Sequence, residues 1–121
     1  MTRLHSQASE RIIATVSAWP GVQTAPHRFG GIELRLGRRE LGHLHGDHLA
    51  DLPFTRQVRD QLIARGRAQP HHILPDSGWV STSINTAADV QAAIDLFKLS
   101  YAHAQRATAK RHQPATDRPV S

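Results

Sequence analysis

The sequence predicts an α+β fold with the element order α-ββ-α-ββ-α, in which three helices pack on one face of an antiparallel sheet. Two observations support this class: apolar residues recur at helical spacing in three segments, and short segments between them alternate apolar with polar residues. A chain of 121 residues fits one domain. We expect residues 1–105 to form this domain and residues 106–121 to form a basic, disordered tail.

The first helix is predicted over residues 6–19, where apolar residues follow one helical face until Pro20-Gly21 ends the pattern. Residues 22–27 then form either a connector or a short edge strand. Residues 32–36 alternate in the period of a half-buried strand, and residues 41–45 form its hairpin partner.

A polar loop is predicted over residues 46–52. The second helix begins at Pro53 or Thr55, and Gly66 occupies the position just after its last turn, where a left-handed residue is favoured. The second strand pair comprises residues 71–74 and 79–85, joined by a turn over residues 75–78.

The third helix begins after a capping box formed by Thr86 and Asp89. Its apolar stripe runs to Ala104 and stops near Arg106, which is why the tail is predicted from that residue onward.

The net charge of +5 suggests nucleic acid as a partner, but its distribution argues against a basic face. Residues 106–121 carry four basic residues and one acidic residue, a balance of 4 − 1 = +3. The rest of the chain has 11 basic and 9 acidic residues, so its balance is only 11 − 9 = +2. Nucleic acid is therefore the less favoured partner, and a small-molecule ligand is favoured over it.

The composition also bears on location. The absence of cysteine excludes disulfides and thiolate sites, and it fits a reducing compartment. No apolar run reaches the length of a membrane span, and the first ten residues lack the apolar core of a signal peptide. We therefore expect a cytoplasmic protein that does not enter the membrane. The sequence leaves the oligomeric state open.

Histidines provide the strongest functional signal, with nine in the chain. His43 and His45 are spaced i and i+2 on a predicted strand, so their side chains project from the same face. Neutral imidazole exchanges protons near pH 7 and is a common metal ligand. We predict a catalytic site built on His43, His45 and His71. Ligand-binding roles are predicted for Glu33, Trp79 and Tyr101.

The register of the first hairpin decides which face carries this pair. A two-residue loop at Arg38-Arg39 places His43 opposite Leu34, on the face covered by the helices. A three-residue loop shifts the pairing by one residue, so that the histidines join Glu33 on the open face and Leu44 enters the core. The sequence leaves both registers open.

The cofactor is also left open. A carboxylate such as Glu33 or Asp47 beside the histidines would complete a mononuclear site for a divalent metal. A His-x-His pair on a strand is more often structural or merely exposed than catalytic, and spacing alone favours a bound metal less than a functional site in general.

The order of these motifs resembles the luciferase-domain family, which includes the fungal bioluminescence luciferases and many small bacterial proteins. His43, His45 and His71 fall on the family's matching histidines. The segments that carry the resemblance are Gly42-His43-Leu44-His45, Asp51-Leu52-Pro53, residues 66–71, Gly78-Trp79-Val80, Asp89 and Ser100-Tyr101.

The resemblance implies a shared domain that, in its characterised branch, oxygenates a small aromatic lactone with molecular oxygen and no established metal. Light emission is not implied, because Arg67 replaces a tryptophan of the fungal pattern and the fungal membrane anchor has no counterpart. A fainter likeness links residues 74–101 to the YjbR-like, double-wing proteins. That likeness implies a nucleic-acid-binding or protein-binding module without catalysis as the alternative function.

Overall fold

The computed structural model describes residues 3–27 and 30–111. Six antiparallel strands form one sheet in the order β1-β2-β3-β4-β6-β5, and three helices accompany it, which confirms the α+β class. The elements are α1 (Arg3–Ser17), β1 (Val22–Pro26), β2 (Ile32–Leu36), β3 (Arg39–His45), β4 (Leu49–Pro53), α2 (Arg56–Ala64), β5 (Gln69–Pro70), β6 (Trp79–Ser83) and α3 (Ala87–Arg111).

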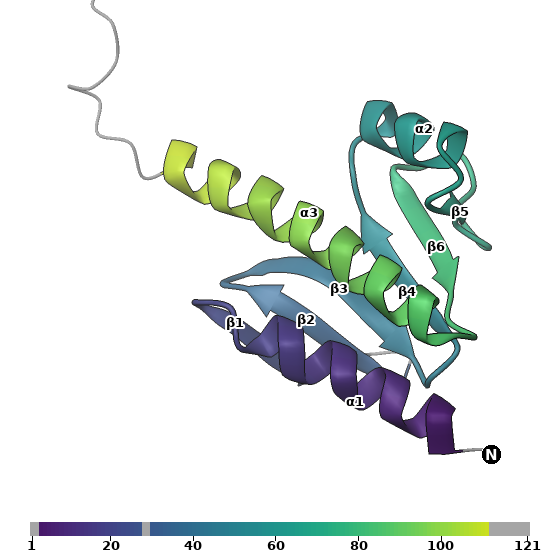
Figure 1. Ribbon diagram of the computed structural model, residues 1–121. Helices are drawn as coiled ribbons and strands as arrows, with labels where there is room; N and C mark the ends of the chain where they lie inside the picture. The colour runs from purple at the N-terminus through teal and green to yellow at the C-terminus, as the bar shows by residue number, and fades with distance from the viewer. Residues whose placement is uncertain (1–2, 28–29, 112–121) are drawn as a thin grey trace, which may run out of the picture.

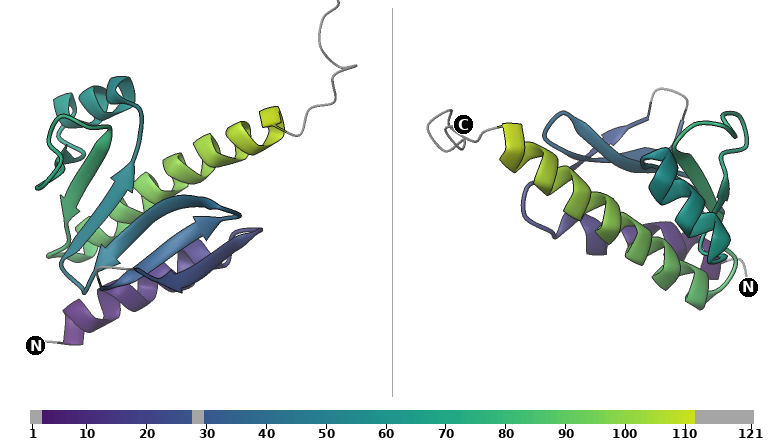
Figure 2. Two further views of the ribbon diagram at one scale, coloured as in Figure 1. Left: turned by 180° about the vertical axis from the view of Figure 1, so that it is seen from behind. Right: turned by 90° about the horizontal axis from the view of Figure 1, so that it is seen from above.

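Helices α1 and α3 lie side by side across one face of the sheet (Figure 1). The view from behind shows the opposite face without either helix in front of it (Figure 2), and we call this the open face. Helix α2 packs at the β5–β6 end. The core between the layers is aliphatic around one aromatic ring, with Ile12, Leu34, Leu44 and Phe97 at most 1% exposed.

Side-chain caps begin the second and third helices. Thr55, one of the two predicted starts of α2, accepts the N–H of Val58 on its hydroxyl oxygen at 3.2 Å. At α3, Thr86 accepts the N–H of Asp89, and the Asp89 carboxylate accepts the N–H of Thr86, each at 3.1 Å. The predicted capping box is therefore confirmed.

The prediction of a loop over residues 46–52 was wrong, because Leu49–Pro53 forms β4 in the middle of the sheet. Ala50 and Leu52 are fully buried, and both belong to the hydrophobic core. Asp51 lies between them and is also fully buried. Burying an acidic residue is costly unless it is paired, so the strand depends on partners that are distant in the sequence.

Two further predictions need correction. Residues 71–74 are not a strand: β5 covers only Gln69–Pro70, and the chain then turns because the ring of His71 accepts the backbone N–H groups of Ile73 and Leu74.

Helix α3 continues beyond residue 105 to Arg111, since its alanine-rich end favours helix without an apolar stripe. Residues 112–121 of the predicted tail lie outside the described residues. Residues 22–26 form the edge strand that was one of two alternatives.

The register of the first hairpin follows from a β-bulge. Leu36 pairs with Arg39 beside the turn, whereas Glu33 pairs with His43, and the shift occurs where Leu41 is the extra residue in β3. Leu41 and Leu44 are buried in the core. The open-face arrangement is therefore the correct one, and His43 lies on the same face as Glu33, but a two-residue turn at Gly37-Arg38 followed by the bulge produces it instead of the expected three-residue loop.

Gly42 permits this bulged strand to pack closely. A Cβ atom at this position would lie 2.8 Å from the Phe97 ring and 2.8 Å from the carbonyl oxygen of Asp51. No side chain fits between β3, β4 and α3 at this point. Gly42 therefore lets β3 pack directly against β4 and α3.

Within residues 3–27 and 30–111, no helix combines the length and the apolar character that crossing a bilayer requires.

Candidate functional site

A pocket of about 460 Å³ opens on the open face of the sheet. Its size is within the range of cavities that hold small organic molecules. Its walls come from β3, β4, β6, the connector after β1 and the loop after β5. The lining residues are His27, Glu40, His43, His45, Asp51, His71, His72, Ile73, Leu74 and Trp79.

Asp51 is the centre of this site. Its Oδ1 accepts a hydrogen bond of 2.6 Å from the hydroxyl of Ser81, its partner across β4 and β6. Its Oδ2 faces the Nε2 atoms of four imidazoles. These Nε2 atoms lie 2.9 Å (His45), 3.2 Å (His72), 3.3 Å (His43) and 3.3 Å (His71) from Oδ2.

His43 and His45 approach each other as well as Asp51. Their Nε2 atoms are 3.0 Å apart, so the three atoms of this set are separated by 2.9, 3.0 and 3.3 Å. Metal–ligand bonds of about 2.1 Å at right angles place neighbouring ligand atoms roughly 3.0 Å apart. The set therefore has the spacing of one face of an octahedron around a single ion.

More ring nitrogens face Oδ2 of Asp51 than this oxygen can accept as hydrogen-bond donors. A carboxylate oxygen offers about two lone-pair directions, but four ring nitrogens crowd Oδ2 of Asp51. The 3.0 Å contact between His43 and His45 needs a proton on one Nε2 and a lone pair on the other. A cation shared by the Nε2 atoms of His43 and His45 and by the Asp51 carboxylate would satisfy the lone pairs of these three groups together.

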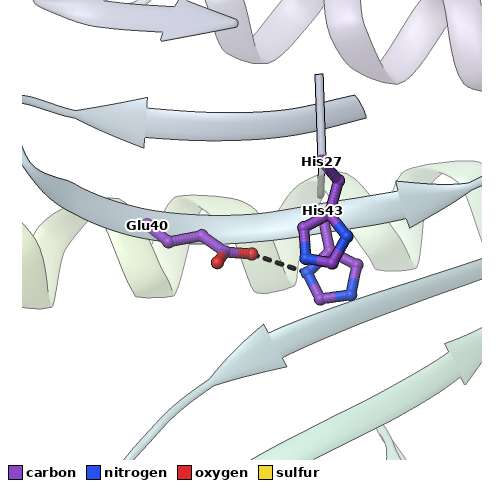
Figure 3. Close-up of side chains that lie close together, drawn as sticks. All are labelled: His27, Glu40 and His43. Carbon is purple, nitrogen blue, oxygen red and sulfur yellow. Dashed lines mark hydrogen bonds and ion pairs between the residues drawn. The ribbon is translucent and has the colours of Figure 1, made fainter. Parts of the chain in front are cut away.

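Carboxylates flank His43 on both of its ring nitrogens. Figure 3 shows the Glu40 carboxylate turned toward the ring, and Glu40 Oε2 lies 2.6 Å from Nδ1. Burial by itself lowers the pKa of His43, but hydrogen bonds and charges from Asp51 and Glu40 outweigh burial and raise this pKa to about 9. Burial likewise raises the pKa of Asp51, but hydrogen bonds from His43, Ser81 and His72 hold it well below its ordinary value.

His71 has a different hydrogen-bonding pattern. Its Nδ1 accepts the backbone N–H groups of Ile73 and Leu74, each at 3.1 Å, so a neutral ring carries its proton on Nε2. Burial lowers the pKa of His71, which favours this neutral form. Its Nε2–H then points toward Asp51 as a hydrogen-bond donor. His72 stacks on it with ring centroids 4.4 Å apart.

The rim of the pocket is apolar. Ile73 and Leu74 expose 71% and 49% of their surface, although both are large hydrophobic residues. Trp79 lies beside the imidazoles, with its ring 5.5 Å from that of His43 and 5.9 Å from that of His71. A ligand in this pocket would therefore meet apolar surface at the rim and the histidine–aspartate cluster at the base.

A family model described as "Luciferase domain" matches residues 38–100, just over half of the chain. The chain belongs to the luciferase-domain family. The matched segment of this luciferase-domain protein contains His43, His45, Asp51 and His71, whereas His27 lies outside it. No curated protein and no solved structure matches the chain.

The structure brings together His43, His45 and His71, and it places Trp79 in the same pocket. Glu33 is on the open face, but its carboxylate pairs with Arg35 at 3.2 Å and does not line the pocket. Tyr101 is on α3, where its hydroxyl donates to the carbonyl oxygen of Pro20 at 2.7 Å. It is not among the lining residues, so its predicted ligand-binding role gains no support from this placement.

The carboxylate beside the histidines is neither Glu33 nor Asp47. Asp47 accepts the backbone N–H of Ser9 instead. The sequence carried one signal for Asp51: it is a lone acid in the apolar run Leu49-Ala50-Asp51-Leu52, and buried acids are rare unless paired. Glu40, His27 and His72 were not predicted as site residues, because only the bulge and two loops bring them to the pocket.

Proposed function

We propose that this luciferase-domain protein binds one divalent first-row transition ion through His43, His45 and Asp51, and oxidises a small organic molecule in the adjoining pocket with dioxygen. The observation that carries the proposal is the spacing of the three ligand atoms, 2.9 to 3.3 Å. Two histidines and one carboxylate on one face of the coordination sphere are the usual ligands of non-haem iron(II) oxygenases.

Such a ligand set leaves positions on the ion for other molecules. When bound, the ion would supply a site at which dioxygen and the organic molecule meet. Incorporation of both oxygen atoms into the organic product balances without any further reductant, because dioxygen is then the only co-substrate. The resemblance to luciferases that oxygenate a small lactone supports the same reaction class.

The side chains around the ion would orient the ligand carboxylate, donate a hydrogen bond and contact the organic molecule. Ser81 and the buried strand β4 hold the Asp51 carboxylate in place. His71, neutral with its proton on Nε2, can donate a hydrogen bond toward the base of the pocket. Trp79, Ile73 and Leu74 provide the apolar surface against which an organic molecule loses its water.

Metal content tests the first half of the proposal. Tag-free protein is loaded without oxygen with iron(II), manganese(II) or zinc(II), desalted and measured for bound metal. We expect about one ion per chain. Asp51→Asn and His45→Asn should lose that ion, because each removes one of three ligands.

His48→Asn is the matched control. His48 is an exposed histidine in the turn after β3 and does not line the pocket, so its replacement should leave the ion bound. Equal metal content in His48→Asn and Asp51→Asn, or none in the unmodified protein, would show that no specific centre exists.

Nitric oxide, a dioxygen surrogate, tests whether the ion has an open position. We expect the iron(II) protein to give the electron paramagnetic resonance signal of a high-spin iron nitrosyl. No such signal from protein with one iron per chain would argue against an oxygenase and leave a closed, structural metal site.

A further inference from the structure

We infer that Glu40 is a positioning residue of this centre: it holds the His43 ring in the tautomer and orientation that aim the Nε2 lone pair at the ion. The inference rests on the proposed metal centre and adds a residue that does not touch the ion. Glu40 instead contacts Nδ1 of His43, the ring nitrogen that does not face Asp51.

The bulge in β3 creates this pair. Residues i and i+3 of a regular strand point to opposite faces. Because Leu41 is an extra residue, Glu40 pairs with Arg35 and His43 pairs with Glu33, and both side chains emerge on the open face. Glu40 Oε2 thereby comes within 2.6 Å of His43 Nδ1 (Figure 3).

This contact determines which ring nitrogen carries the proton. A carboxylate is only an acceptor, so Nδ1 must donate, and an ion that displaces the proton of Nε2 then meets a lone pair on that nitrogen. A carboxylate on the outer nitrogen also makes the ligating nitrogen more basic. The ring of His27 stacks on that of His43 with centroids 3.8 Å apart and limits its rotation (Figure 3).

A second ion between His27, Glu40 and His43 is the competing explanation, since ligand atoms of these residues lie within 4.8 Å of one another. The distances favour the hydrogen bond. Neighbouring ligand atoms on one ion are roughly 3.0 Å apart, whereas the 2.6 Å between Glu40 Oε2 and His43 Nδ1 is shorter than this and close to the length of a charge-assisted hydrogen bond.

The test compares cobalt(II) affinity, measured by competition with a chelator, in Glu40→Ala, Glu40→Gln and the unmodified protein. Loss of a hydrogen bond to a ligating histidine typically weakens metal affinity about 10- to 100-fold. We expect that loss for Glu40→Ala and a smaller loss for Glu40→Gln, whose amide oxygen still accepts the proton. The zinc-loaded protein should also show a His43 Nδ1–H resonance that exchanges faster with solvent in Glu40→Ala.

Glu33→Gln is the matched control. Glu33 is the cross-strand partner of His43 and carries the same charge, but its carboxylate contacts Arg35. The control should keep its cobalt affinity within about threefold of the unmodified protein, which separates the hydrogen bond from general electrostatics.

The outcomes separate the two proposals. Equal affinities in Glu40→Ala and Glu33→Gln would overturn the role of Glu40 and leave the metal centre standing, provided that Asp51→Asn still loses the ion. Two ions in the unmodified protein and one in Glu40→Ala would make Glu40 a ligand and also overturn the inference. No binding by the unmodified protein would remove the centre itself.

Discussion

The hydroxyl of Ser81 donates a 2.6 Å hydrogen bond to Oδ1 of Asp51, and the two residues face each other across β6 and β4. This bond orients a fully buried carboxylate, so that its other oxygen points at the imidazoles. The histidine cluster therefore depends on a residue that does not line the pocket.

Replacing Ser81 with alanine should lower the free energy of unfolding by about 1–3 kcal/mol, because a buried acceptor loses its donor. Urea unfolding of metal-free protein measures this loss. Ser83→Ala, at the exposed end of the same strand, should change stability by less than about 0.5 kcal/mol. A Ser81 variant as stable as the Ser83 variant would contradict the role given to this bond.

Gly42→Ala should destabilise the protein by about 1–3 kcal/mol, because the added Cβ would press on the backbone of Asp51 and on the Phe97 ring. Thermal unfolding compares this variant with Gly46→Ala. Gly46 has a φ of 59° with open space around its Cβ position, so alanine there meets only the left-handed backbone cost of about 1–2 kcal/mol. The two variants also differ at the site, since only Gly42→Ala should disturb metal binding.

The stability of the protein should fall in acid partly through His103. Burial, together with Arg106 and Arg39, lowers the pKa of this ring, which packs edge-on against Phe54. A histidine with a lowered folded-state pKa stabilises the fold above its unfolded value of about 6.5, and this contribution is lost as pH falls through the folded-state pKa.

His103→Gln removes that titration. Urea unfolding of both proteins from about pH 8 to about pH 5 should show the smaller acid loss in the variant. If the free energies of unfolding of the two proteins change in parallel with pH, protonation of His103 does not destabilise the fold.

Metal should stabilise the fold as well as enable chemistry. An ion that binds only the native state at a free concentration of 100 times its Kd adds about 2.7 kcal/mol to the free energy of unfolding. We expect zinc(II) to raise the melting temperature of the unmodified protein, and a chelator to reverse the rise. Asp51→Asn should melt at the same temperature with and without zinc.

The sequence by itself determined the parts of this protein that depend on neighbouring residues. The capping box of Thr86 and Asp89 and the side-by-side projection of His43 and His45 follow from local spacing, because caps and strand alternation involve residues a few positions apart. The same spacing restricted the start of α2 to Pro53 or Thr55, and the structure has Thr55.

Only the tertiary structure decided where these histidines point and what they meet. The bulge at Leu41 turns His43 and His45 to the open face, and it depends on Gly42 fitting under Phe97 from a helix far along the chain. Asp51 is tolerated in a buried strand because Ser81 and histidines from two segments, β3 and the loop after β5, surround it. The register of β3 and the burial of the Asp51 carboxylate both depend on contacts between residues far apart in the sequence, and local spacing does not predict such contacts.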